Sequence, residues 1–180
     1  MKVIKKLGLA IAPHLTHLIN TIISTQIYPT ILQISHITPN LKPEKDPYSI
    51  SSYRPLNNLS TIDKIVQEHI KLSLMEFLVN NNIIHLQHHG GLKNHSTTTA
   101  LACLTHKLKQ FLDENFTTTT LQTDMSTALD TVEHTILLQK LDYYGIRGGE
   151  LNLIKSFLTN RKQYVEIDGI KSKTLDSLNC

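Results

Sequence analysis

The sequence contains no tryptophan, and aromatic residues make up only 6% of its 180 residues. Its hydrophobic content of 40% is nevertheless ordinary for a globular protein, so the core must consist mainly of leucine and isoleucine. A chain of this length can bury roughly 70% of the surface that its unfolded form exposes. We therefore expect one folded domain, with two lobes at most.

Cysteine and long apolar runs are also scarce. The two cysteines, Cys103 and Cys180, provide neither a disulfide framework nor the spacing of zinc ligands, and Cys103 fits a small buried position on a helix. The apolar run at residues 7–12 follows three lysines but is shorter than the core of a secretory signal. No stretch approaches the ~20 apolar residues of a membrane span. We expect neither a secretory leader nor a membrane helix.

Excess charge is small as well. A net charge of +3 is compatible with binding to nucleic acid but does not establish it. Histidine is more abundant, and four histidines crowd a glycine-bearing loop together with Gln87: His85, His88, His89 and His95. Spacing across a flexible loop fixes no coordination geometry, and no cysteine or carboxylate lies nearby in the sequence. The sequence alone therefore does not predict a zinc site there.

The apolar periodicity predicts several helices and a few strands. Apolar side chains spaced three and four residues apart predict helices over residues 13–27, 60–79, 96–112, 136–144 and 151–158. Pro13 would lie in the first turn of the first helix, Ser60 and Ser96 would cap the second and third, and Gly145 would end the fourth. Strands are expected over residues 31–38, 117–120, 164–167 and 170–174, with Pro39 ending the first. The fold class expected is α+β, with helices packed on a small, mostly antiparallel sheet.

The most informative stretch is residues 121–148, LQTDMSTALDTVEHTILLQKLDYYGIRG. The expected strand over residues 117–120 leads to Asp124, and Asp130 then precedes a helix. This stretch resembles the first catalytic motif of reverse transcriptases from non-LTR (LINE-like) retrotransposons, F-x-D-x-S-K-A-F-D-x-V-x-H-x-x-L-L-x-K-L-x-x-Y-G-I-x-G. Two departures from that pattern matter: its lysine is Thr127 here, and its second phenylalanine is Leu129.

The resemblance continues on both sides, over residues 12–180. ITPNLK and SSYRP match segments of the polymerase fingers, which implies that Lys42 and Arg54 contact the triphosphate of an incoming nucleotide. HHGGLKNHST matches a template-binding loop, in which only Lys93 keeps its charge. LNLIKSFLTNRKQYVEIDG resembles the family's N-W-I-x-S-Y-L-x-x-R-x-Q-x-V-x-x-x-G. The implied organisation is an N-terminal extension (1–12), a fingers-like helical region with a basic loop (13–115) and a partial palm (116–180).

The chemistry of this family depends on two divalent ions, which activate the primer 3′ oxygen and hold the triphosphate. The resemblance assigns the first Mg²⁺-binding carboxylate to Asp124, assisted by the main-chain carbonyl of Met125. The other carboxylates belong to a Y/F-A-D-D hairpin, which is absent from these 180 residues.

We therefore interpret the sequence as the fingers and the first half of the palm of a truncated reverse transcriptase that is inactive by itself. The partners implied are an RNA template and a DNA primer, and the implied location is intracellular, in the nucleus or cytoplasm. Two alternatives stay open: a nucleic-acid-binding module without catalysis, and a helical interaction protein without either property. The sequence leaves the oligomeric state undetermined.

The departure at Leu129 yields a first prediction. In the family, an aromatic ring five residues after the motif's first aspartate blocks the ribose 2′-hydroxyl, and leucine is smaller and differently shaped. When this motif replaces that of an active relative, discrimination between dNTP and rNTP should weaken. Single-nucleotide incorporation assays measure the ratio, and an unchanged ratio would refute the prediction.

Overall fold

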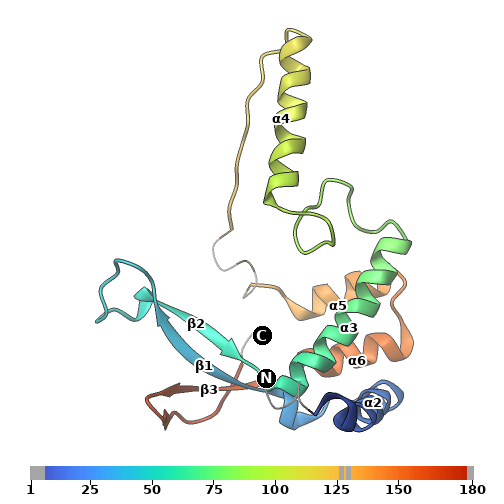
Figure 1. Ribbon diagram of the computed structural model, residues 1–180, viewed down its shortest axis with the longest axis vertical. Coiled ribbons are helices and arrows are strands. Elements are labelled where there is room, and N and C mark those ends of the chain that lie inside the picture. The colour runs from blue at the N-terminus through green and yellow to red at the C-terminus, as the bar shows by residue number, and fades with distance from the viewer. Residues whose placement is uncertain (1–6, 126–127, 129–130, 178–180) are drawn as a thin grey trace. The chain divides into compact units, whose positions relative to one another are not determined.

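Helices and short strands follow one another along the chain in the computed structural model, which describes residues 7–125, 128 and 131–177 (Figure 1). Within that part, the helices are α2 (Gly8–Thr25), α3 (Thr61–Asn80), α4 (Thr97–Asp113), α5 (His134–Tyr143) and α6 (Gly148–Leu158), with short 3-10 turns η1 (Thr30–Gln33) and η2 (Ile50–Ser52). The strands are β1 (Ile34–Leu41), β2 (Tyr53–Asn58), β3 (Lys162–Ile167), β4 (Ile170–Lys171) and β5 (Leu175–Asp176). The expected α+β class is confirmed. None of the described helices combines the length and apolar character needed to cross a bilayer.

The chain divides into two compact units. One unit comprises Met1–Lys71 and Thr127–Cys180, and the other is Leu72–Ser126. The first unit contains the sheet and most of the packed core, whereas the second contains the end of α3, a loop and α4. The functional boundaries expected after residues 12 and 115 stay predictions.

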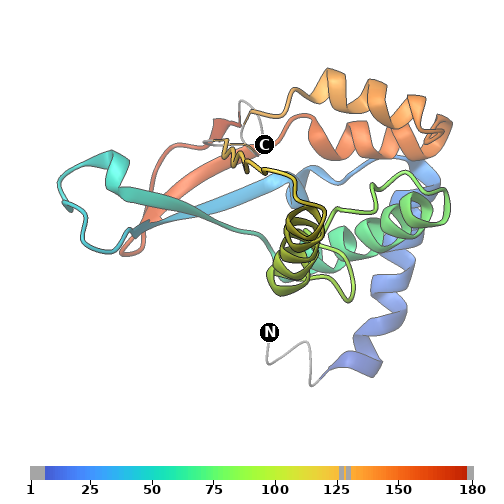
Figure 2. The same ribbon diagram turned by 90° about the horizontal axis from the view of Figure 1, so that it is seen from above.

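The sheet has the strand order β2-β1-β3-β4, with β5 also paired to β3. Three pairings are antiparallel, and β1 pairs with β3 in parallel from Ile34↔Lys162 to Ile37↔Val165. The sheet is therefore mostly antiparallel, as expected. Figure 2 shows β1 and β3 side by side, with the loop between β1 and β2 extending beyond them. The parallel pairing joins segments far apart in the sequence, so the local spacing of apolar residues does not predict it.

The first strand differs from its prediction at both ends. Residues 31–33 belong to η1, and β1 begins at Ile34 and continues through Pro39 to Leu41. Pro39 faces Pro55 across the β1–β2 pair. The Lys42 N–H bonds to the Ser52 carbonyl, and hydrogen-bonded pairs alternate along an antiparallel ladder, so Pro39 and Pro55 form a non-hydrogen-bonded pair. Their missing N–H groups therefore cost the ladder no bond. The described pairing of β1 with β3 ends at Ile37, which leaves Pro39 with a partner strand on one side only.

Helix α2 also begins earlier than expected, at Gly8, which places Pro13 inside the helix instead of in its first turn. The preceding residues are mostly alanine, leucine and isoleucine, and the Ile11 N–H bonds to the Leu7 carbonyl at 2.9 Å. A proline at position 13 removes the bond to the carbonyl of Leu9. Because Leu9 is 96% exposed, water can hydrate that carbonyl.

The core of the first unit has buried side chains from α2, η1, α3 and α6 and from the connection between α2 and η1. Its buried members are Ile22, Tyr28, Leu32, Val66 and Leu153, and partly buried side chains from α2, α3 and α6 pack against them. The ring of Tyr28 meets the ring of Phe157 edge-on, with 5.0 Å between the centroids. The other buried members of the core are aliphatic, in agreement with the low aromatic content.

A polar network lies inside this core. The Tyr28 hydroxyl donates a hydrogen bond to the Asp63 carboxylate, whose other oxygen accepts from Gln67 Nε2 at 3.0 Å. Both Tyr28 and Asp63 are 1% exposed. Ser60 caps α3 as expected, since its Oγ accepts from the Asp63 N–H at 3.0 Å, but the buried role of the Asp63 side chain was not predicted. Burial, reinforced by the hydrogen bond to Asp63, raises the pKa of Tyr28 above its usual range.

This network predicts that Tyr28→Phe destabilises the protein by about 1–3 kcal/mol, because it leaves a buried carboxylate with one donor fewer. Urea unfolding followed by circular dichroism measures the change. The matched control is Tyr48→Phe, at a tyrosine that is 96% exposed. Since Tyr28 ionises only in the unfolded chain above its ordinary pKa of 10.0, wild-type stability should also fall as the pH rises beyond that value. Equal stabilities of the two variants would contradict the assignment.

Candidate nucleotide and template site

Lys42 and Arg54 come from the two strands of one hairpin. Lys42 directly follows β1, and its N–H donates to the Ser52 carbonyl at 2.9 Å. Arg54 is the second residue of β2 and lies opposite Asn40. Side chains alternate along each strand and match across the pair, so Lys42 and Arg54 project from the same face at the same end of the hairpin. The structure thus brings together two of the residues that the sequence assigned to nucleotide binding.

Lys42 and Arg54 differ in whether the protein already engages the charged group. Lys42 is half-buried, and its Nζ donates to the Ser51 carbonyl at 2.7 Å. Arg54 is exposed, and no ion pair engages it within the described residues. The Arg54 guanidinium can give two parallel N–H groups to a phosphate, whereas the Lys42 ammonium keeps two N–H donors besides the one bonded to the Ser51 carbonyl.

The loop that joins these strands is ordered by its own hydrogen bonds. The Tyr53 hydroxyl donates to the Pro47 carbonyl at 2.9 Å, and the Tyr48 N–H donates to Asp46 Oδ1 at 3.0 Å. Within the polar, proline-containing segment 40–55, the structure has η2 and the start of β2. Arg54 is consequently held by a strand, which limits the directions that its side chain can take.

Lys93 lies in the second unit, in the loop before α4. Its side chain is exposed, and its main-chain carbonyl lies 3.0 Å from His95 Nδ1. The loop ends at Ser96, which caps α4 as predicted: the Ser96 Oγ accepts from the Thr99 N–H at 3.2 Å, and the Ser96 N–H donates to Thr99 Oγ1 at 2.8 Å. This capping box determines where the loop meets the helix.

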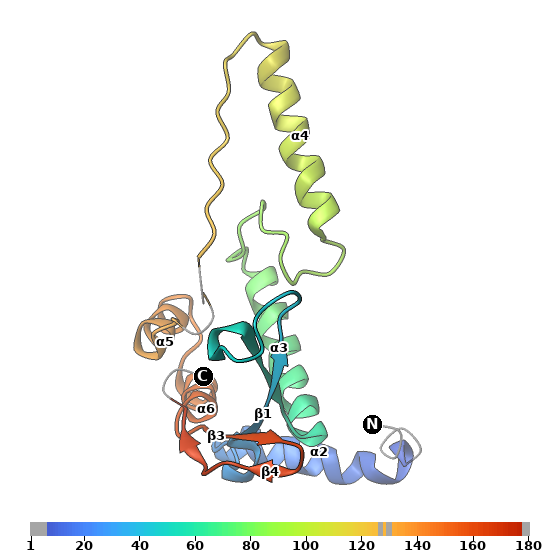
Figure 3. The ribbon, with the colours of Figure 1, turned by 90° about the vertical axis from the view of Figure 1, so that its left-hand side faces the viewer.

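Asp124 follows no strand, and the prediction of a strand over residues 117–120 is wrong. Residues 116–125 carry no regular secondary structure and run back alongside α4 (Figure 3). The threonines there have a high β propensity, but propensity reflects packing in a sheet, and no described strand pairs with them. Asp124 and Met125 are both exposed.

The described residues do not complete a magnesium site around Asp124. No group of three or more His, Cys, Asp or Glu side chains within the described ranges is arranged to hold a metal ion. Leu129 and Asp130 lie outside the described residues, and Asp142, on α5, pairs with Arg147 at 3.3 Å. Two-ion chemistry needs at least two convergent carboxylates. The donors described here do not fit it, so no catalytic step through a metal follows from this geometry.

Helix α4 does not bury its apolar face. Its leucines include Leu101 at 60% and Leu112 at 62% exposure, and no residue of the helix is buried. The prediction that Cys103 is buried is therefore wrong, because it lies exposed on this helix. Apolar periodicity identifies which face of a helix is apolar, but it does not reveal whether another element covers that face.

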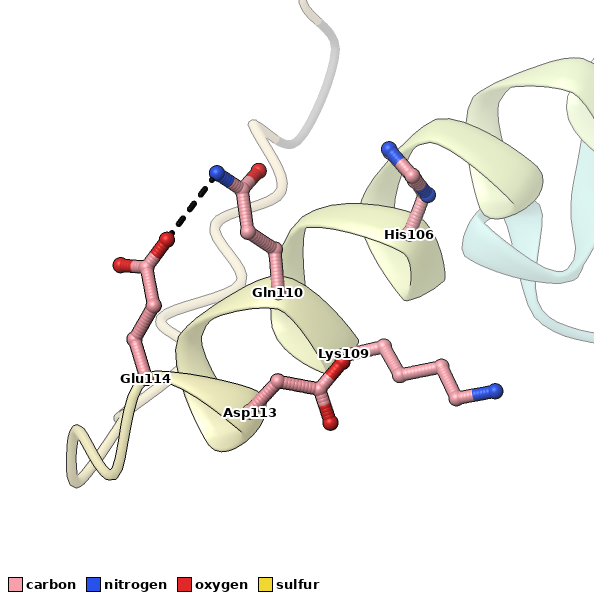
Figure 4. A pocket seen from close by; sticks show the side chains of 5 residues that line it. All are labelled: His106, Lys109, Gln110, Asp113 and Glu114. Carbon is pink, nitrogen blue, oxygen red and sulfur yellow. Dashed lines mark hydrogen bonds between the residues drawn. The ribbon is translucent and has the colours of Figure 1, made fainter.

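A hollow on α4 carries no recognisable site. Its lining consists of His106, Lys109, Gln110, Asp113 and Glu114, all from the end of this helix and its cap (Figure 4). Gln110 Nε2 donates to Glu114 Oε1 at 3.2 Å. Because no other segment contributes a side chain, the hollow is part of an ordinary helix surface.

Helix α5, which follows the Asp124 motif, forms as expected, but the cap at its N-terminus was not predicted. Gly145 follows α5 with a φ of 99°, and the Ile146 N–H bonds to the Leu141 carbonyl at 3.0 Å, as in a left-handed helix end. At the start of α5, the Glu133 carboxylate accepts from the N–H groups of Ile136 at 2.8 Å and Thr135 at 3.1 Å. These bonds, with that from Ile136 the strongest influence, lower the pKa of Glu133. The sequence feature that could have indicated this cap is the acidic Glu133 directly before the apolar periodicity of α5.

The chain is similar in sequence to a known protein. No family model matches the chain. A probable RNA-directed DNA polymerase from transposon BS of Drosophila melanogaster is 28% identical over 160 residues, which cover 86% of this chain. The chain resembles a transposon polymerase. The match covers only 17% of that polymerase, so the relative is a much longer protein.

The Glu133 cap predicts a pH-dependent contribution to stability. A carboxylate whose pKa is lowered on folding stabilises the protein above its ordinary pKa of 4.5, and this stabilisation disappears as the pH falls through the lowered value. Glu133→Ala should therefore reduce thermal stability at pH 7 more than at pH 3. The control is Glu76→Ala, at an exposed glutamate on α3. A pH-independent difference for Glu133→Ala would contradict the cap.

Proposed function

We propose that this chain provides the fingers and the first half of the palm of a non-LTR retrotransposon reverse transcriptase. The observation that carries the proposal is the 28% identity to a transposon RNA-directed DNA polymerase, which extends over 86% of the chain. The motif around Asp124 and the hairpin that holds both Lys42 and Arg54 also support it. The partners proposed are an RNA template and a DNA primer, in an intracellular location.

Each proposed site residue has a role that suits its chemistry. Arg54 and Lys42 bind the triphosphate of the incoming nucleotide, the first by two parallel hydrogen bonds and the second as a point charge. Lys93 contacts the phosphate backbone of the template. In a polymerase completed by the missing carboxylates, Asp124 and the Met125 carbonyl would help to hold Mg²⁺, and Leu129 would face the sugar of the nucleotide. The ion would supply positive charge for the phosphates and the primer oxygen.

We further propose that these 180 residues alone do not polymerise. One carboxylate and one carbonyl hold a hydrated Mg²⁺ weakly, and no second carboxylate motif is present in the sequence. A second candidate function follows from this incompleteness, namely binding of nucleic acid without catalysis. The observation that favours it is the exposed Arg54 on an ordered hairpin, since phosphate binding needs cations but no carboxylates.

The experiment that tests the proposal grafts residues 12–180 into the matching region of the Drosophila transposon polymerase. Primer extension on an RNA template should persist in the graft and fall by about 10²-fold or more with Asp124→Ala. Arg54→Ala should raise the KM for dNTP about tenfold, because a charge-assisted phosphate contact is lost. The matched control is Lys45→Ala, at an exposed lysine in the hairpin loop.

The chain by itself, beside its Asp124→Ala variant, should give no extension with Mg²⁺ or Mn²⁺. Extension by the chain that the variant lacks would refute inactivity. A graft that extends primers equally well with Asp124→Ala would refute the catalytic assignment. If the grafts are inactive but the chain binds RNA with an affinity that falls steeply with salt, the binding module is the correct function.

A further inference from the structure

Tyr53 ties the loop between β1 and β2 to the hairpin that holds Lys42 and Arg54. Its hydroxyl donates to the carbonyl of Pro47, in the middle of loop residues 42–52, at 2.9 Å. Tyr53 is half-buried, begins β2 and directly precedes Arg54. The proposed function assigns a role to Arg54 but none to Tyr53, although the hydroxyl bond acts on the same strand.

Other hydrogen bonds order the ends and the turns of this loop. The Lys42 N–H bonds to the Ser52 carbonyl at 2.9 Å and joins the two ends of the loop. Bonds between residues three apart turn the chain locally, as from the Ser49 N–H to the Asp46 carbonyl at 3.3 Å. The bond from the Tyr53 hydroxyl spans six residues and connects the middle of the loop to a strand.

The charged side chains of the described strands all lie on one face of the sheet. Alternate residues of a strand point to opposite faces, and paired residues of neighbouring strands share a face. The register pairs Asn40 with Arg54 in the hairpin and His36 with Tyr164 between β1 and β3. The residues of this charged face are Arg54, Lys162, Glu166, Lys171 and Asp176. Tyr53 belongs to the opposite face, on which the described strands carry no charged residue.

Tyr53 and Arg54 are neighbours in β2 and therefore project from opposite faces. Lys42 continues β1 opposite Ser52, so it projects from the charged face together with Arg54. The Tyr53 hydroxyl thus points away from a phosphate held by these two cations, and it draws Pro47 toward the uncharged face. An influence of Tyr53 on a bound phosphate must pass through the main chain between Tyr53 and Arg54.

We propose that Tyr53 is a positioning residue for nucleotide binding: its bond to Pro47 restrains the start of β2, so that Arg54 is preorganised on the charged face for the triphosphate of a nucleotide. This inference rests on the proposed function, in which Arg54 binds the phosphates. Restraining a phosphate-binding side chain before the ligand arrives reduces the entropy lost on binding. The hydroxyl carries this role, which makes phenylalanine the informative substitution.

The test is a fluorescence titration of the 180-residue chain with methylanthraniloyl-labelled dATP in the presence of Mg²⁺. We expect Tyr53→Phe to weaken binding about three- to tenfold, because it removes the bond to Pro47 and keeps the ring. The matched control is Tyr48→Phe, at a tyrosine of the same loop that is 96% exposed, and it should retain wild-type affinity. Hydrogen exchange checks the cause: the main-chain N–H of residue 53, which bonds to the Ile50 carbonyl, should exchange faster in Tyr53→Phe, while the amides of α3 keep their protection.

A double variant separates positioning from a merely structural role. Arg54→Ala alone should weaken binding about tenfold, and adding Tyr53→Phe should cause no further loss, because Tyr53 acts through Arg54. Equal affinities of Tyr53→Phe and Tyr48→Phe, or losses that add up in the double variant, would overturn the positioning role and leave the phosphate site intact. Wild-type affinity in Arg54→Ala, or no binding by the wild-type chain, would instead refute the phosphate site of the proposed function and this inference with it.

Discussion

The first unit depends on the hydrogen bond between Tyr28 and Asp63. Tyr28 lies between α2 and η1, so its hydroxyl joins that connection to α3, while its N–H donates to Ser156 Oγ on α6 at 2.8 Å. Its ring also packs on Phe157 of α6. One residue therefore connects α2, α3 and α6 just before β1 begins at Ile34. The hairpin with Lys42 and Arg54 continues from β1.

Burying a carboxylate is unfavourable unless donors surround it, because the protein interior solvates charge poorly. Asp63 receives donors from Tyr28 and Gln67, and its own N–H bonds to Ser60. A shift of α3 by one residue would move Asp63 away from the Tyr28 hydroxyl, whereas the bonds with Gln67 and Ser60 lie within the helix and its cap. The network thus specifies the position of α3 against α2 more narrowly than aliphatic packing does, since aliphatic contacts are not directional.

The two units differ in how much of their apolar surface they bury. The first unit has a core with Ile22, Val66 and Leu153 at its centre, whereas α4 in the second exposes its leucines. Asp124 follows that exposed helix and lacks a second described carboxylate, so its proposed catalysis needs groups that these residues do not supply. The hairpin cations need no such completion, because the proposed phosphate binding by Lys42 and Arg54 would use side chains that are already in place.

The sequence by itself determined the helices, the caps at Ser60, Ser96 and Gly145, and the α+β class, because these depend on neighbours within four residues. The resemblance to reverse transcriptases also assigned Lys42 and Arg54 to two neighbouring segments of the polymerase fingers. Only the tertiary structure decided the parallel pairing of β1 with β3, the passage of β1 through Pro39, the lack of a strand before Asp124 and the exposure of Cys103. Each of these depends on which distant segment lies beside the residue, and periodicity and propensity contain no information about a distant partner.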